Sequence, residues 1–224
     1  MKLARPDIRH PRIVLAGSAD GDDAGLVEAL RRRGLHGHWL GWDDPRTLDA
    51  DLVILRESSD RPEFLPWTAR VTHLLNAPEV VAWNVGRRHQ RDLGRAGVPV
   101  LRGRRPSRSA ARTALVFLGG VQSHAFGANS AVDADFELWD LGQTALQAAA
   151  DHIGIGVDEL LYARADVVED AGDVELAALD LVAPSLGWTL LDDDAREDAQ
   201  RRFALGVESA LDRLGLGPLS HRGP

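Results

Sequence analysis

The feature that most constrains the fold is a pair of strand-like runs joined by a short acidic turn. They lie within LLYARADVVEDAGDVELAALDLVAPSLGW, residues 160–188. If residues 162–168 and 176–182 pair antiparallel, alternate side chains share one face of each strand. The expected faces are Tyr162, Arg164, Asp166 and Val168 on the first strand, and Leu176, Ala178, Asp180 and Val182 on the second. The pattern predicts a β-hairpin on which Asp166 and Asp180 converge.

The charges of this hairpin have two interpretations. Two carboxylates on an apolar strand face are costly to bury without a cation, and Mg²⁺ is a hard ion that prefers oxygen ligands. Arg164 could then serve an anionic substrate or a developing oxyanion. The alternative is a structural ion pair between Arg164 and one of the aspartates. The spacing alone favours this alternative, because structural pairs are the commoner cause of such groupings.

Composition excludes several classes of protein. The chain of 224 residues has no cysteine, which rules out disulfides, thiolate catalysis and cysteine-based zinc sites, and Lys2 is its single lysine. The net charge of −8 would repel nucleic acid. No run approaches about 18 apolar residues, and the N-terminal segment has charges where a signal peptide needs an apolar run. We therefore expect a cytoplasmic protein without nucleic-acid or membrane partners.

The first half alternates between strand-like and helix-like segments. Strands are expected at residues 12–17, 35–42, 50–56 and 98–101, and helices at 22–34, 62–75 and 78–97, the last with a turn. Asp22 or Asp23 is the expected N-cap of the first helix, and Gly34 its end. This alternation predicts a small open α/β sheet with parallel strands.

The second half is typical of an α+β unit with an antiparallel sheet. Gly119-Gly120 between two apolar runs predicts a hairpin, and the opening stretch supplies a second hairpin that turns near residues 170–173. Helices are expected at residues 140–154, capped by Asp140, and at 192–217.

A composition break separates the two halves. Residues 102–112, RGRRPSRSAAR, contain five arginines and predict a basic linker. The linker is either a strap for an anion or a solvated segment, and charge runs are more often solvated. The expected division is an α/β domain at 1–101, the basic linker at 102–112, an α+β domain at 113–218 and a tail at 219–224.

Short motifs run through the chain in a fixed order. They are WDDP, ADLVILR, LLNAPEVVAWN and GVPV in the first half, and LVFLGGVQSHAF, YARADVV and ALDLVAPSL in the second. In this order they resemble the ATP-grasp ligases, in particular actinobacterial proteins with a core like that of D-alanine–D-alanine ligase or RimK. The resemblance covers most of residues 12–210. It implies a pre-ATP-grasp-like domain followed by part of an ATP-grasp domain.

The resemblance also implies roles for individual residues. Asp166 and Asp180 match metal ligands, and Arg164 matches the arginine that supports an acyl phosphate or a tetrahedral intermediate. The residues implied to lie beside the cofactor or the cleft are Arg87, Ser123, His124 and Ser185. Mg²⁺ and ATP are the implied cofactors.

The chain departs from the family at the site itself. A glutamate that bridges two Mg²⁺ ions in the family falls on Ala178, and a second acidic position falls on Ala183. A lysine that follows WN falls on Arg87 or Arg88. The family's central ATP-binding subdomain is replaced by residues 102–112 alone. The hairpin therefore resembles an incomplete Mg–ATP site, at which Asp166 and Asp180 would hold one Mg²⁺ weakly.

Two functions from different classes follow from this resemblance. The preferred one is a degenerate, non-catalytic ATP-grasp-like protein that acts as a binding or partner protein. The alternative is an ATP- and Mg-dependent carboxylate–amine ligase that works through an acyl phosphate. Loss of a subdomain should leave apolar surface around Phe117, Phe126 and Trp139, which predicts a homodimer or a complex with another chain.

Overall fold

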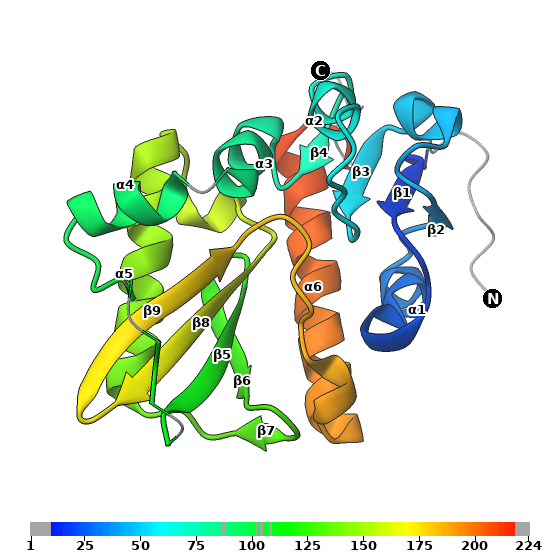
Figure 1. Cartoon of the computed structure of the whole chain (residues 1–224). Helices are drawn as coiled ribbons and strands as arrows, with labels where there is room; N and C mark the ends of the chain where they lie inside the picture. The colour runs from blue at the N-terminus through cyan, green and yellow to red at the C-terminus, as the bar shows by residue number, and fades with distance from the viewer. Residues whose placement is uncertain (1–9, 87, 102, 104, 108, 218–224) are drawn as a thin grey trace.

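Two β-sheets form the framework of the molecule (Figure 1). The computed structural model describes residues 10–217 apart from 87, 102, 104 and 108. Sheet A has parallel strands in the order β2-β1-β3-β4, and sheet B has antiparallel strands in the order β7-β6-β5-β8-β9. The predicted fold class, a small parallel α/β unit followed by an α+β unit with an antiparallel sheet, is confirmed.

Sheet A is built from the apolar runs of the first half. Its strands are β1 (Ile13–Ala16), β2 (Gly37–Leu40), β3 (Leu52–Leu55) and β4 (Leu74–Leu75). Every residue of β1 and β3 is buried, as expected for central strands of a parallel sheet that is covered on both faces. The predicted strands at 12–17, 35–42 and 50–56 are confirmed, with shorter bounds.

The start of the first helix differs from the prediction. Helix α1 spans Leu26–Arg32, and its N-cap is Gly25. The 3₁₀ turn η1 (Gly21–Asp23) precedes it. The prediction that Asp22 or Asp23 caps this helix is wrong, because both carboxylates bond to residues far along the chain.

The predicted helix over residues 62–75 is also wrong. Helix α2 covers only Phe64–Thr68, and the last two leucines of the segment form strand β4 beside β3. Both leucines are buried in the sheet, so strand pairing overrides the helical pattern. The remaining short elements of this half are η2 (Pro45–Asp49), α3 (Pro78–Val85) and α4 (His89–Arg95).

Sheet B contains the two predicted hairpins. Its strands are β5 (Ala111–Leu118), β6 (Val121–Phe126), β7 (Ala131–Val132), β8 (Tyr162–Asp170) and β9 (Asp173–Asp180). Gly119 and Gly120 join β5 to β6 with φ of 58° and 76°, the left-handed pair that a two-residue hairpin turn needs. Both hairpin predictions are confirmed.

A β-bulge in β9 changes the expected face of one residue. Asp166 lies opposite Ala178, and Val167 lies opposite Leu176, so that Ala177 is an extra residue in β9. The bulge shifts the alternation by one position. The prediction that Leu176 shares a face with Asp180 is therefore wrong. Leu176 packs in the core on the other side of the sheet.

Helix α5 covers sheet B, and helix α6 links sheet B to sheet A (Figure 1). Helix α5 (Phe136–Ile153) packs on the face of sheet B that carries Leu115 and Phe117. Its N-cap is Asp135, whose carboxylate accepts from the backbone N–H of Leu138, so the predicted cap at Asp140 is wrong by more than a turn. The helix begins earlier than its apolar periodicity indicated.

Helix α6 (Asp193–Arg213) lies between the two sheets. Its N-cap is Asp192, and the acidic first turn agrees with the prediction. Phe203 and Val207 share one core with Ile13 of sheet A and Tyr162 of sheet B. The last helix of the chain therefore holds the two halves together.

The connection between the halves runs along the edge of β9. In place of the predicted strand at 98–101, Val100 makes a single parallel bridge to Leu176. The backbone N–H of Ser107 donates to the Asp170 carboxylate at the end of β8. Strand β5 then begins at Ala111, inside the predicted linker. The division into domains stays a prediction.

None of the helices in the described part of the chain combines the length and the apolar character that a bilayer crossing requires.

Candidate functional site

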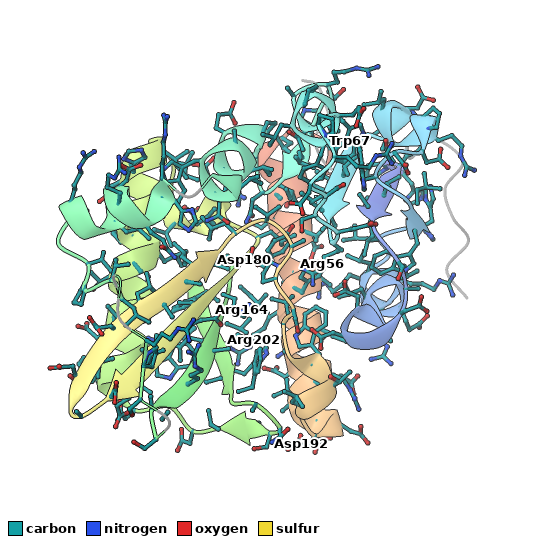
Figure 2. The ribbon with its side chains drawn as sticks, viewed as in Figure 1. Arg56, Trp67, Arg164, Asp180, Asp192 and Arg202 are labelled. Atoms are coloured by element: carbon teal, nitrogen blue, oxygen red, sulfur yellow. The ribbon has the colours of Figure 1, made fainter. Side chains whose placement is uncertain are left out.

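Three charged residues of the β8–β9 hairpin lie on one face of sheet B. Arg164 is directly opposite Asp180, and Asp166 is opposite Ala178. Figure 2 labels Arg164 and Asp180 near the gap between sheet B and α6. The Arg164 guanidinium contacts both carboxylate oxygens of Asp166: Nε lies 2.9 Å from Oδ1, and Nη2 donates to Oδ2 at 3.1 Å. The structural pair that the spacing favoured is therefore present.

The Asp180 side chain bonds to the backbone just beyond the end of β9. Its Oδ1 accepts from the backbone N–H of Val182 at 3.0 Å, which fixes the chain as it leaves β9. The strand register places Asp180 on the same face as Arg164 and Asp166.

The loop that begins at Ser185 surrounds a carboxylate of the chain itself. Oδ2 of Asp22 accepts from Ser185 Oγ at 3.0 Å, from Leu186 N at 2.6 Å and from Gly187 N at 2.8 Å. Oδ1 accepts from Thr189 N at 3.1 Å. The donors in the region where the resemblance placed phosphate are occupied by Asp22.

Carbonyl groups of the same loop also have hydrogen-bond partners. Arg56 Nη2 donates to Pro184 O at 2.8 Å, Arg164 Nη1 donates to Ser185 O at 3.1 Å, and His124 Nε2 lies 2.6 Å from Leu186 O. Together with the bonds to Asp22, these contacts fix loop 184–189 from both sides.

Close packing explains the glycine in this loop. Gly187 has φ of 67° and lies against the Phe126 ring, where an added Cβ would be 2.3 Å from Cδ1. A larger residue would fit neither the left-handed backbone nor the space, so glycine allows the loop to close over β6.

A buried ion pair lies behind the loop. Arg56 Nε is 3.1 Å from both oxygens of Asp23, and Nη2 donates to Oδ1 at 2.7 Å. The Arg56 side chain is only 2% exposed, and its guanidinium is 5.0 Å above the Tyr162 ring. Burial raises the pKa of the Asp23 carboxyl, and the neighbouring Arg56 opposes this effect.

Two buried asparagines bond to backbone groups of β8 and of the end of β9. Asn76 Nδ2 donates to the carbonyls of Tyr162 and Leu181, and its Oδ1 accepts from Leu161 N at 2.7 Å. Asn84 bonds in the same way to Leu179 O and Leu181 N.

The Tyr162 hydroxyl donates to Leu55 O and lies 2.9 Å from Val182 O. Burial raises the pKa of this hydroxyl well above its usual value, so it stays protonated. We call the contacts of Asp22, Asp23, Arg56, Asn76, Asn84 and Tyr162 the junction.

Ser123 and His124 of the SHA motif lie on β6 beside the loop. Ser123 Oγ is 2.9 Å from His124 Nδ1. Burial lowers the pKa of the His124 imidazole, so the neutral form dominates at neutral pH. Arg87, which the resemblance placed beside the cofactor, lies outside the described residues.

A cavity of about 400 Å³ opens at the other end of the same sheet face. Asp166 and Arg112 are the charged residues of its lining. The rest of its lining is mostly small or apolar, and includes Ala114, Phe126, Val168, Ala177 and Ala178. We call this region the open end of sheet B.

The predicted apolar surface is only partly correct. Phe117 is fully buried under α5 and meets the Trp139 ring edge-on, so its predicted exposure is wrong. Phe126 and Trp139 are partly buried against the cores. Among the large apolar side chains of the described residues, Phe136 at the start of α5 is the most exposed, at 82%.

The donors present do not fit a two-metal Mg²⁺ centre. Within the described residues there is no group of three or more His, Asp or Glu side chains placed to hold a metal ion. Asp166 is bound by Arg164, and Asp180 is bound by Val182 N. Mg²⁺ usually needs carboxylates together with phosphate or water oxygens, and two engaged carboxylates supply little of that set.

Comparison with known proteins agrees with this architecture. The family described as the N-terminal domain of D-cycloserine synthetase DcsG matches residues 8–76. No curated protein matches the chain. The crystal structure of D-cycloserine synthetase DcsG superposes with a TM-score of 0.74 and 22% identity, over 90% of this chain and 99% of DcsG. The chain has the fold of the ATP-grasp ligases.

Two further ligases share this ATP-grasp fold. The ligase PsnB, solved with a minimal precursor, Mg and ADP, has a TM-score of 0.59 and 14% identity, over 87% of this chain and 97% of PsnB. The D-alanine–D-alanine ligase from Bacillus anthracis, solved with ATP, has a TM-score of 0.62 and 10% identity, over 91% and 98%. The predicted resemblance is confirmed at the level of the fold.

Sequence reasoning missed the junction. It treated Asp22 and Asp23 as helix caps, and it gave Arg56, Asn76 and Asn84 no role. The available signal was local: an arginine follows directly after a fully apolar strand, and asparagines lie beside apolar runs whose residues are buried. Apart from the Asp23–Arg56 pair, their partners lie at residues 161–189, so spacing along the chain could not identify them.

Proposed function

We propose that the chain is a degenerate ATP-grasp-like protein that has lost ligation chemistry and acts as a binding or partner protein. One observation carries the proposal. The groups matched to metal and phosphate roles are bonded within the chain: Arg164 to Asp166, Asp180 to Val182 N, and Ser185 to Asp22. A ligase needs these groups directed at ligands, because catalysis depends on preorganised charge at the reacting atoms.

The missing carboxylates support the same proposal. Ala178 stands opposite Asp166, where the family resemblance expects a bridging glutamate, and contributes only a methyl group to the cavity wall. Each lost carboxylate removes charge that would hold a divalent cation. Only ten residues, 101–110, separate the Val100 bridge from β5, which leaves little chain for a second nucleotide-binding subdomain.

The partner is a second copy or another protein chain. Phe136 is 82% exposed, and Val132 of the neighbouring edge strand is 38% exposed, so apolar surface is available beside β7. Light scattering across a concentration series should give a mass above that of the monomer, and Phe136→Ser should reduce it. A monomeric mass at high concentration, with no complex formed in cell extract, would contradict the proposal.

The alternative is an ATP- and Mg-dependent ligase that joins a carboxylate to an amine through an acyl phosphate. The shared face of Arg164, Asp166 and Asp180 favours it. In this case the contacts of Arg164 and Asp22 would have to open when nucleotide binds.

Calorimetry distinguishes the two functions. The chain is titrated with a non-hydrolysable ATP analogue in the presence of Mg²⁺. In a separate assay, ADP release from ATP is measured with mixed carboxylates and amines. We expect binding weaker than micromolar. A micromolar Kd needs about 8 kcal/mol of binding free energy, and half a nucleotide pocket has too few contacts to supply it. Micromolar binding together with amine-dependent ADP release would replace the proposal with the ligase.

A further inference from the structure

Ser123 has an unusual place in its strand. On β6, His124 lies opposite Val116 and Gln122 lies opposite Phe117, so Ser123 is the extra residue of a β-bulge. In a regular strand, neighbouring side chains point to opposite faces, and a bulge removes this constraint. The Ser123 hydroxyl can therefore reach the ring of the next residue, and Oγ lies 2.9 Å from Nδ1.

The neighbouring carbonyl decides which ring nitrogen of His124 carries the proton. Nε2 lies 2.6 Å from Leu186 O, and a carbonyl oxygen can only accept, so Nε2 carries the hydrogen. In the neutral imidazole, Nδ1 then has a lone pair and accepts the Ser123 hydroxyl. A hydroxyl bonded to a ring nitrogen, with the opposite nitrogen oriented by an acceptor, is the arrangement that activates serine nucleophiles.

A positive charge lies next to this pair. Nη1 of Arg202, on α6, donates to the carbonyl of Gln122, the residue before Ser123, at 3.4 Å, while Nε pairs with Asp198 Oδ2 at 2.7 Å. Figure 2 shows Arg202 on the side of α6 that faces sheet B. The Arg202 side chain is 47% exposed, and Ser123 and His124 are both partly exposed, so small molecules can reach the group. A cation beside an attacked carbonyl stabilises the developing oxyanion.

We propose that Ser123 is a nucleophile activated by His124 and that it accepts acyl groups from small activated esters. Oγ attacks the carbonyl carbon of the ester while its proton passes to Nδ1. The bond to the leaving alcohol breaks, and the alcohol takes that proton. Water then attacks the acyl-serine through the same imidazole, releases the acid and restores the hydroxyl. The net reaction is ester hydrolysis, which uses no nucleotide or metal and goes beyond the proposed function.

The first test uses p-nitrophenyl acetate. Release of p-nitrophenolate is followed by absorbance, and the acylated residue is identified by peptide mass spectrometry. We expect acylation at Ser123 in the wild type and in the control Ser130→Ala, and none in Ser123→Ala. His124→Gln should slow acylation about 100-fold, the scale of a lost general base. Absence of an adduct on Ser123, or an unchanged rate in a folded His124→Gln variant, would overturn the proposal.

The second test does not depend on how His124 variants fold. The chain has no cysteine, so Ser123→Cys and the exposed control Ser130→Cys each carry a single thiol. An imidazole that accepts the thiol proton raises the thiolate fraction at neutral pH. We expect iodoacetamide to alkylate Ser123→Cys about 10-fold faster than Ser130→Cys. An equal or slower rate would show that His124 only supports the loop and would refute the activation.

Discussion

The junction and the open end of sheet B occupy neighbouring parts of one molecule and differ in almost every respect. At the junction, four hydrogen bonds hold Asp22, three contacts with Asp23 hold Arg56, and two asparagines bond to buried backbone groups. At the open end, Asp166 and Arg112 border a largely apolar cavity of about 400 Å³. Many contacts hold the two halves together at the junction, whereas the open end of sheet B has a cavity beside it.

This difference has a consequence for function. Arg56 holds both the Asp23 carboxylate and the carbonyl of Pro184, so opening loop 184–189 at this place would separate a buried ion pair, which is costly. The cavity at the open end of sheet B is present without such a separation. The contrast favours binding at the open end over catalysis at the junction.

The largest expected effect comes from breaking the buried pair. Arg56→Met should lower the free energy of unfolding by about 3 to 5 kcal/mol, because it leaves the Asp23 carboxylate buried without its partner. Urea denaturation followed by circular dichroism measures the change. The control is Arg46→Met, which removes an exposed pair with Asp44 and should leave stability unchanged within error. An equal loss of unfolding free energy in both variants would mean that the buried Arg56–Asp23 pair contributes no more than the exposed pair.

The next effect concerns the carboxylate inside loop 184–189. Asp22→Ala removes the acceptor of four hydrogen bonds and should cost about 2 to 3 kcal/mol, on the scale of hydrogen bonds to a charged group in a partly exposed position. Thermal melting would measure this loss. Asp20→Ala makes the same change of charge two residues away, at an exposed aspartate that accepts from Ser18. Its melting temperature should match the wild type.

A smaller effect should appear with pH. Burial lowers the pKa of His124 below its ordinary value of 6.5, so the unfolded chain takes up a proton at this residue that the folded chain does not. This contribution to stability is present above the unfolded pKa and is lost as the pH falls from there towards the folded pKa. His124→Gln should therefore reduce the loss of stability between pH 7 and pH 5. Parallel urea titrations of both proteins would reveal the difference, and identical slopes would contradict it.

The smallest expected effect is at Asp180, on the hairpin face that also carries Arg164 and Asp166. Asp180→Asn keeps an oxygen for Val182 N and relieves repulsion with Asp166, so stability should change by no more than about 1 kcal/mol. Millimolar Mg²⁺ should leave the melting temperature of the wild type unchanged. If Mg²⁺ instead raises it, and Asp180→Asn abolishes the rise, the hairpin holds the metal, because a ligand that binds only the folded chain stabilises it.

The face of the hairpin on which the charged residues lie could be predicted, but the groups to which they bond could not. Strand alternation correctly places Arg164, Asp166 and Asp180 on one face, because a side-chain period of two is a local property of extended backbone. That Arg164 binds Asp166, and that Asp180 binds Val182 N, depends on rotamers and loop shape. Two bulges, at Ser123 and Ala177, also escaped prediction, because a single extra residue leaves no mark in the apolar pattern.

By itself, the sequence determined the local elements of this protein: the apolar strands of sheet A, the two hairpins of sheet B and the acidic start of α6. These follow from periodicity and turn residues, which act over a few positions. The tertiary structure alone decided that Asp22 would enter a loop 163 residues further along the chain, that Arg56 would be buried beneath that loop, and that α5 would cover Phe117. Such contacts depend on how the two sheets and α6 pack, and no local pattern of residues records that packing.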